Sequence, residues 1–199
     1  VDTEDPNYSN YDDCLYNKDQ TVLICCPGGK SSVKFPSTVK EVAQYGFAGN
    51  TKSLKSIELP NTITKLGDYV FGICYALESV VLPESITEIP TRAFQSCYRL
   101  KNITLPAKLK TIGELAFYSN DSLTSITIPN TVESIGAEAF SSCLFCTLFA
   151  AEAQTTVTDL SQLDNESTYT LRSARAFLLY SSAVSDKICS SNGSAVGSV

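Results

Sequence analysis

The chain has no histidine, no methionine and no tryptophan among its 199 residues. Without histidine, no imidazole can activate a serine or cysteine nucleophile, which excludes the commonest hydrolytic relays. The absence also weakens the case for zinc, because Cys143 and Cys146 form a lone CxxC pair with no histidine to complete a site. We therefore predict that the protein is not an enzyme, has no catalytic residues, and uses neither a cofactor nor a metal.

Clustered positive charge and long apolar runs are also missing. Lysine and arginine together number 15 against 21 aspartates and glutamates, which gives a formal net charge of −6. Nucleic-acid phosphates require clustered lysine and arginine, so this composition argues against nucleic acid as a partner. No apolar run reaches the roughly 18 residues that a membrane helix needs, and we therefore predict no membrane span.

What the sequence does contain is a phrase of 23 residues, written four times from residue 54 onward. A fixed period of this length is typical of a solenoid, whose units pack only against their neighbours. A blurred copy precedes the four, offset by 24 residues, so about five units span residues 31–145. The three strictest columns of the phrase are Leu54, Leu77, Leu100 and Leu123; Pro60, Pro83, Pro106 and Pro129; and Phe71, Phe94, Phe117 and Phe140.

The spacing within one unit predicts its path. Val80 and Leu82 are two apart, which is the period of a strand with both side chains inward. Pro83 ends that strand because it cannot donate to the ladder. Ile86 and Ile89 are three apart, a helix-like or 3₁₀-like spacing, and the phrases GDYVF, GELAF and GAEAF suggest a short turn of helix. We expect a repeat solenoid with parallel strands on one face and short helical, 3₁₀ or irregular return segments.

The N-terminal part differs from the repeats. Residues 1–13 are acidic and polar, and we interpret them as a tail. Within residues 14–30, two apolar runs at 14–16 and 21–26 flank a polar turn, a pattern that predicts a β-hairpin. Such a hairpin would cap the open end of the solenoid by covering its first apolar layer.

The repeat pattern does not continue beyond residue 146. Residues 146–154 are apolar but too short to span a bilayer, so we interpret them as a terminal cap or junction. Residues 155–199 differ in kind, with two expected strands near 168–172 and 176–181. This segment is small for an independent core, so it either packs on the solenoid or is a truncated accessory module.

The pattern LxxIxLPxxIxxIgxxAFxxC closely resembles the BspA-type leucine-rich repeat, which is abundant in surface proteins of host-associated bacteria and of some parasitic protists. Five copies keep the Pro, Phe and Cys/Asn columns together, and Pro90 is a departure where Gly67, Gly113 and Gly136 stand in other copies. The resemblance implies a secreted or cell-surface binding protein, with adhesion to host matrix proteins or other cells as the usual role. That location rests on the resemblance alone, because no signal sequence is visible at the start of the chain.

Three of the eight cysteines occupy one repeat column, in which asparagine stands in two other copies. Such a column is expected at an inward corner, where a thiol or an amide donates to a neighbouring backbone carbonyl. We therefore favour free, buried thiols over disulfides in this column. Its members are Asn50, Cys74, Cys97, Asn120 and Cys143.

A disulfide is more plausible in the N-terminal hairpin. Cys14 lies on its first strand, while Cys25 and Cys26 lie at the end of its second. An exported protein can keep such a bridge oxidised, and the sequence leaves both partners for Cys14 open. Cys189 has no obvious partner.

Two surfaces are candidates for binding. Residues between the inward positions of each strand should face outward, and they are mostly short and polar with Val81 as the single apolar member. A second surface is the corner after the Cys/Asn column, which carries Tyr75 and Tyr98, because exposed tyrosine is a common hot-spot residue. Ordinary solvent exposure is the alternative for both surfaces. The strand-face candidates are Ser56, Glu58, Ser79, Val81, Asn102, Thr104, Ser125 and Thr127.

Two classes of function follow from this pattern. The first is an extracellular adhesion module whose strand face binds a protein, such as a host extracellular matrix or plasma protein, with a glycan as another ligand class. The second is a structural spacer or display stalk that carries a C-terminal module, which in one version binds carbohydrate. Mutation of the strand face distinguishes them, since a spacer should tolerate it.

Overall fold

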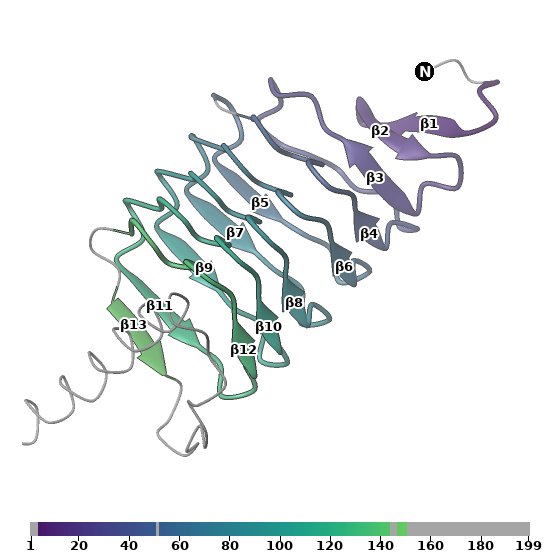
Figure 1. The fold of residues 1–199 in the computed structure, drawn as a ribbon. Helices are drawn as coiled ribbons and strands as arrows, with labels where there is room; N and C mark the ends of the chain where they lie inside the picture. The colour runs from purple at the N-terminus through teal and green to yellow at the C-terminus, as the bar shows by residue number, and fades with distance from the viewer. Residues whose placement is uncertain (1–3, 51, 144–146, 151–199) are drawn as a thin grey trace, which may run out of the picture.

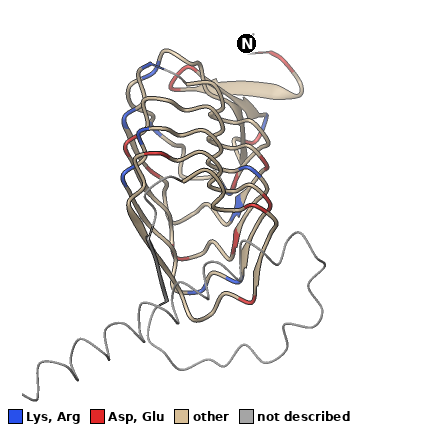
Figure 2. Ribbon diagram, turned by 60° about the vertical axis from the view of Figure 1, so that its left-hand side comes forward, with Lys and Arg blue, Asp and Glu red and all other residues tan. Residues whose placement is uncertain are grey.

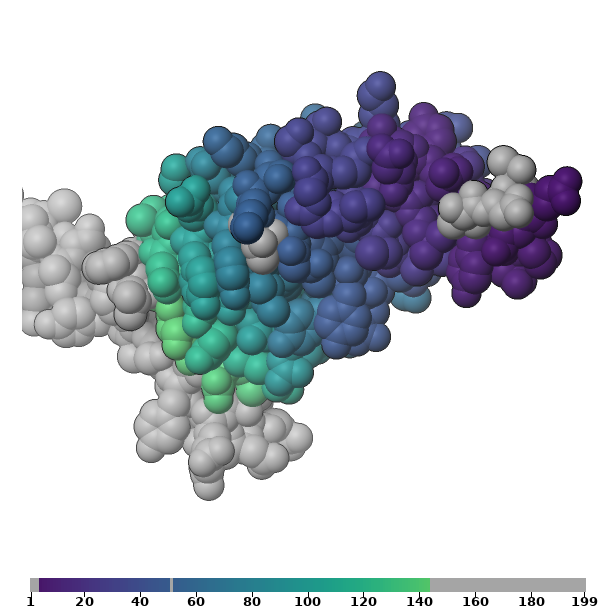
Figure 3. All heavy atoms as spheres, turned by 90° about the horizontal axis from the view of Figure 1, so that it is seen from above, coloured from purple at the N-terminus to yellow at the C-terminus, as the bar shows by residue number. Residues whose placement is uncertain are grey.

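In the computed structural model, the chain coils into a stack of layers, one for each repeat (Figure 1). The structure describes residues 4–50 and 52–143, together with the backbone of residues 147–150. The sequence runs in order along the stack, as the colours of the space-filling view show (Figure 3). The predicted repeat solenoid with parallel strands is confirmed, and its strands line two sides of the stack.

The first side carries the strand of each repeat that was predicted from the two-residue period. β5 (Ser56–Glu58), β7 (Ser79–Val81) and β9 (Asn102–Thr104) form a parallel sheet. In each strand the central residue is buried and the last residue is exposed. The next strands along this side are β11 (Ser125–Ile128) and β13 (Thr147–Ala150), which pair with each other in parallel.

The second side carries a further set of strands that the sequence analysis did not predict. Each return segment contains a two-residue strand instead of a helical turn, and the described part of the chain contains no helix. Consequently, it contains no helix that could cross a membrane. These strands are β4 (Glu41–Val42), β6 (Lys65–Leu66), β8 (Glu88–Ile89), β10 (Thr111–Ile112) and β12 (Ser134–Ile135).

The phrase GDYVF shows why the expected helical turn does not form. Tyr69 has a φ of 58°, in the left-handed region, where a right-handed helix cannot continue. Its N–H donates to the carbonyl of Thr91 in the next layer at 3.0 Å, whereas a helix would satisfy that group within the segment. The corner is therefore a turn held by hydrogen bonds between layers.

A column of phenylalanines forms the centre of the core. The rings of adjacent layers stack nearly parallel, with centroids 5.1–5.3 Å apart and interplanar angles of 3–10°. This distance follows from the spacing of the hydrogen-bonded layers, which is about 4.8 Å. The first four rings of the column are fully buried and the last is half-buried. The column consists of Phe47, Phe71, Phe94, Phe117 and Phe140.

The N-terminal hairpin predicted for residues 14–30 is present as β2 (Cys14–Asn17) and β3 (Val22–Cys25), which pair antiparallel. The interpretation of residues 1–13 as a tail is wrong for β1 (Tyr8–Tyr11), which pairs antiparallel with β2. The two-residue turn between β1 and β2 has positive φ at both Asp12 and Asp13, 49° and 60°. This is typical of a type I′ hairpin turn, and aspartate tolerates it.

The hairpin cap continues the second sheet of the solenoid. β3 pairs in parallel with β4, which in turn pairs with β6. Lys30 holds the tip of the cap, because its Nζ lies 2.9 Å from Asp12 Oδ2. Asp12 also accepts a hydrogen bond from the backbone N–H of Lys34 at 2.9 Å, and this bond is the main cause of its lowered pKa.

At the other end of the described chain, β13 lies 22 residues after its partner β11, since Ser125 pairs with Thr147. The stack therefore continues into the segment that was interpreted as an apolar cap or junction. A search with a fixed period of 23 residues does not find β13, because β13 follows β11 by 22 residues. Residues 155–199, for which we predicted two strands, lie outside the described residues.

Candidate binding surface

The strand face presents the predicted outward residues as adjacent columns. Glu58, Val81 and Thr104 are register partners on β5, β7 and β9, and all three are exposed. Val81 is the most exposed large hydrophobic residue of the described chain, with 54% exposure. The parallel column of Ser56, Ser79 and Asn102 is also in register, and Ser79 in it is half-buried. The structure thus brings six of the eight predicted residues onto one regular sheet.

The other two predicted residues lie beyond a break in this sheet. Ser125 and Thr127 are exposed on β11, which contacts β9 but forms its ladder with β13. A depression of about 290 Å³ lies between β9 and β11 and is lined by residues of both strands. The face therefore has a flat three-stranded part and a shallow groove at its C-terminal side.

Charges of both signs border the strand face without forming a field of one sign. Figure 2 shows lysine and arginine interspersed with aspartate and glutamate along the stack. At the edge of the strand face, Lys101 Nζ lies 3.0 Å from Glu78 Oε2 in the preceding layer, and this hydrogen bond lowers the pKa of Glu78. An exposed pair of this kind adds little stability. The face is thus suited to polar contacts more than to electrostatic steering.

The second predicted surface is a ridge of stacked aromatic side chains. The rings of Tyr75 and Tyr98 have centroids 5.0 Å apart and an interplanar angle of 21°, and both residues are exposed. Ile73 lies two residues before Tyr75, is exposed, and has a φ of 63°, which is strained for a β-branched residue. Ile73 was not among the predicted residues, although small residues stand at its repeat position in other copies, namely Gly49, Ser96 and Ser119. We define these three residues, Ile73, Tyr75 and Tyr98, as the tyrosine ridge.

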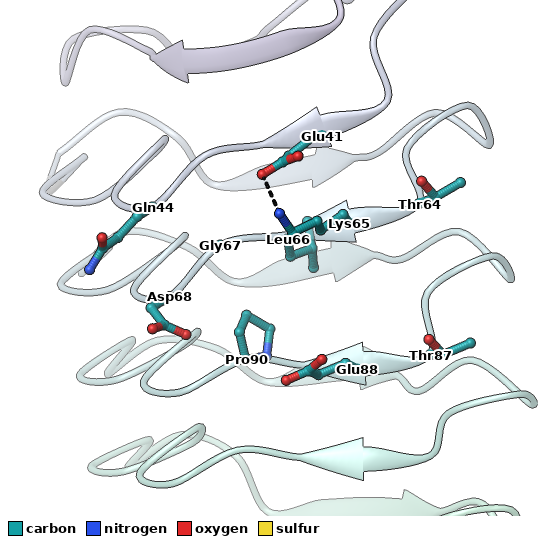
Figure 4. Close-up of a pocket in the computed structure, with 10 residues that line it drawn as sticks. All are labelled: Glu41, Gln44, Thr64, Lys65, Leu66, Gly67, Asp68, Thr87, Glu88 and Pro90. Atoms are coloured by element: carbon teal, nitrogen blue, oxygen red, sulfur yellow. Dashed lines mark hydrogen bonds and ion pairs between the residues drawn. The ribbon is translucent and has the colours of Figure 1, made fainter.

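A depression lies on the second side of the stack, between β6 and β8 (Figure 4). It encloses about 640 Å³ and is lined by Gln44, Asp68, Glu88 and Pro90 among others. Lys65 on its wall pairs with Glu41 at 2.9 Å. The depression coincides with the point where the second sheet divides into two ladders.

Pro90 explains this division. In three other copies the same position is a glycine whose N–H donates to the preceding layer at 2.7–2.8 Å, as Gly113 does to Ile89. Proline has no N–H to donate. A Cβ on Gly67 or Gly113 would also lie within 2.3–2.6 Å of backbone nitrogen in the preceding layer, so the proline ring requires a wider separation. The departure noted in the sequence therefore opens the second side at one place.

The Cys/Asn column faces inward, as predicted. Cys74, Cys97 and Cys143 each donate from Sγ to a phenylalanine carbonyl of the preceding layer, at 3.0–3.1 Å. Burial raises the pKa of Cys74 to about 12 and that of Cys143 to about 11, so both thiols stay protonated and can donate at neutral pH. Asn120 replaces the thiol with an amide whose Nδ2 donates to Phe94 O at 2.9 Å.

Replacing Asn120 with cysteine is expected to stabilise the protein by about 1 kcal/mol. The Oδ1 atom of Asn120 is buried without a hydrogen-bond partner among the described residues, and such an atom costs about 1–3 kcal/mol. A thiol would keep the donor and remove this acceptor. Urea unfolding measures the change. Asn50→Cys is the matched control, expected to destabilise, since Asn50 Oδ1 accepts the N–H of Leu54 at 3.3 Å. A loss of stability in Asn120→Cys would contradict the argument.

Comparison with known proteins places this geometry among bacterial repeat proteins. A family model described as the BspA type leucine rich repeat region matches residues 26–147 in six copies, one more than the sequence analysis counted. A leucine rich cell surface protein from Faecalibacterium prausnitzii A2-165 is 27% identical with a TM-score of 0.72, over 80% of this chain and 44% of that chain. A search of curated proteins found no match.

Two further solved structures have the same repeat architecture. The pneumococcal vaccine antigen PcpA is 27% identical with a TM-score of 0.67, over 84% of this chain and 42% of that chain. A leucine rich repeat protein from T. pallidum is 31% identical with a TM-score of 0.61, over 71% of this chain and 66% of that chain. The chain thus spans less than half the length of the F. prausnitzii and pneumococcal proteins.

Proposed function

Because the chain belongs to the BspA-type leucine-rich repeat family, we propose that it is a cell-surface or secreted binding module whose strand face docks onto a protein. The observation that carries this proposal is the register of exposed side chains on β5, β7 and β9. A solenoid holds such columns rigidly, because each strand is fixed by its neighbours. Preorganisation of this kind lowers the entropic cost of binding.

The chemistry of the face favours a protein as the ligand. Its outward side chains are short and offer hydroxyl, amide and carboxylate groups around the exposed Val81. Among the described residues, the outward side chains of β5, β7, β9 and β11 include no aromatic ring on which a sugar could stack. Host matrix and plasma proteins are the ligand class we propose, in line with the F. prausnitzii relative, which is described as a cell surface protein. We expect no catalysis from this scaffold.

The test is binding of the purified chain to immobilised matrix and plasma proteins, with fibronectin and fibrinogen included, beside a glycan array. The triple variant Glu58→Ala, Val81→Ala, Thr104→Ala is expected to weaken binding to its protein ligand at least about tenfold, because truncated hot-spot residues commonly cost more than 1 kcal/mol each. Surface plasmon resonance measures the affinity of the wild-type chain and that of the triple variant.

A matched control triple lies on the second sheet, where Glu88, Thr111 and Ser134 are register partners on β8, β10 and β12. Their replacement by alanine should leave the affinity unchanged. Equal loss in both triples would contradict a role for the strand face. Binding to glycans alone would favour a carbohydrate ligand, and no binding to either panel would favour the spacer function.

A further inference from the structure

The hairpin cap brings two cysteines of the described chain into direct contact. Cys14 opens β2, Cys26 follows the end of β3, and their Sγ atoms lie 2.9 Å apart. Both side chains are buried, with exposures of 0% and 4%. A disulfide has an S–S distance of about 2.05 Å, so less than about 1 Å of further approach separates the two thiols from a covalent bond.

The structure distinguishes between the two partners that the sequence left open for Cys14. Cys25 is exposed, whereas Cys26 is buried against Cys14. Successive residues of an extended segment point to opposite faces, which accounts for this difference. The N–H of Cys26 also donates to the carbonyl of Gly46 at 2.8 Å. Cys26 is therefore fixed to the first layer of the solenoid, while Cys14 belongs to the cap.

We propose that Cys14 and Cys26 form a disulfide that closes the N-terminal cap covalently over the first apolar layer of the solenoid. The two thiols lose their hydrogens as the Sγ–Sγ bond forms. The oxidant is a small disulfide such as glutathione disulfide, which takes up the two electrons and two protons and becomes two glutathione thiols. A thiolate first attacks this disulfide to form a mixed disulfide, and the second cysteine then displaces the remaining glutathione.

The contact also assigns the two roles in this exchange. The hydrogen bond between the sulfurs lowers the pKa of Cys14, and Lys30 adds to this effect. The same contact raises the pKa of Cys26, together with burial. The thiolate is the attacking species, so Cys14 is the nucleophile and Cys26 the resolving thiol. Both sulfurs are buried in the docked cap, so the finished bond is shielded from reductants.

The cysteines of the repeat column do not share this arrangement. The sulfurs of Cys74, Cys97 and Cys143 are each hydrogen-bonded to a backbone carbonyl. They are therefore expected to stay as thiols under conditions that oxidise the cap pair. This contrast makes the proposal specific to one pair and provides internal controls within the same chain.

Peptide mapping of the full chain tests the proposal. The protein is refolded in a glutathione redox buffer, unfolded in N-ethylmaleimide and digested with trypsin without reductant. Trypsin cuts after Lys18 and Lys30, so the disulfide joins peptide 1–18 to peptide 19–30, with a mass two hydrogens below their sum and with Cys25 alkylated. Separate peptides with Cys14 and Cys26 both alkylated, or a bridge through Cys25, would overturn the proposal.

The contribution of the bond to stability is measured by comparing the melting temperatures of two serine variants and of the reduced wild-type chain. Cys25→Ser should keep the linked peptides and the melting temperature. Cys26→Ser should lose the linkage. Its Tm should fall by roughly 6–12 °C, the loss expected when a cross-link that closes a loop of about 13 residues is removed. Wild-type chain that is unfolded and refolded in excess reductant should show an equally lowered Tm, which keeps the test decisive if Cys26→Ser fails to fold. An unchanged Tm after full reduction would overturn the role of the bond in holding the cap.

Discussion

Replacing Phe94 with alanine is expected to lower the free energy of unfolding by about 3–5 kcal/mol, the usual cost of truncating a buried phenylalanine. Phe94 is fully buried and stacks on Phe71 at 5.3 Å and on Phe117 at 5.2 Å. Its removal therefore leaves a cavity that faces two layers at once. Because each layer is stabilised chiefly by its neighbours, the variant should also weaken the coupling between the two halves of the stack. Urea unfolding followed by circular dichroism measures the loss.

The matched control for this prediction is Phe140→Ala. Phe140 is half-buried and stacks on Phe117 at 5.2 Å at the end of the column. Truncation there removes less buried surface, so its cost should be about half that of Phe94→Ala. Equal losses at the two positions would contradict the account of the column, as would a loss below about 1.5 kcal/mol at Phe94.

A second large effect is expected for Gly113→Ala, which should destabilise the protein by about 2–3 kcal/mol. A Cβ at this position would lie 2.6 Å from the backbone nitrogen of Thr91 and 2.7 Å from the carbonyl carbon of Pro90. These atoms belong to the backbone of the preceding layer and cannot rotate away, so the strain of overpacking must separate the layers. The hydrogen bond from Gly113 to Ile89, now 2.7 Å long, should weaken with it.

Gly29→Ala is the control for this second prediction. An added Cβ at Gly29 would meet no atom within 4 Å, so the substitution should be neutral or slightly stabilising. Thermal unfolding compares the two variants, and hydrogen exchange at residues 111–113 reports on the opening between β8 and β10. A Gly113→Ala protein as stable as Gly29→Ala would show that the layers can separate here without cost.

The strand face could be predicted from the sequence because a period of two fixes which side chains point outward. Ile57 and Val80 are buried, and the residues on either side of Ile57 are exposed, as that period requires. The inward Cys/Asn column was also predictable, since cysteine and asparagine share the ability to donate to a carbonyl. In both cases the repetition of one pattern in several layers reduced the ambiguity of any single copy.

The second sheet could not be predicted from the same spacing. Ile86 and Ile89 are buried three residues apart, which fits a helical turn as well as the two-residue strand that the structure contains. Only the hydrogen bonds between layers separate these alternatives, as at Tyr69, and such bonds have no local sequence signal. β1 was missed for a related reason, because Asp12 and Asp13 resemble a polar tail until their positive φ angles are known.

The breaks in the two sheets were also difficult to predict from the sequence. Pro90 was visible in the sequence as a departure from glycine, but its consequence depends on the N–H that the glycines donate to the preceding layer. The separation of β9 and β11 has no such marker, since Ser125 and Thr127 fit the repeat as well as Asn102 and Thr104 do. The groove at the edge of the strand face thus follows from layer geometry alone.

Site-specific photo-crosslinking shows which surface of the solenoid contacts the protein ligand. A photoreactive residue is placed at position 81 on the strand face, at position 88 on the second sheet, or at position 98 on the tyrosine ridge, three sites that are all exposed. We expect the ligand to crosslink from position 81 and not from position 88 or 98. Crosslinking from position 88 or 98, with none from position 81, would contradict it.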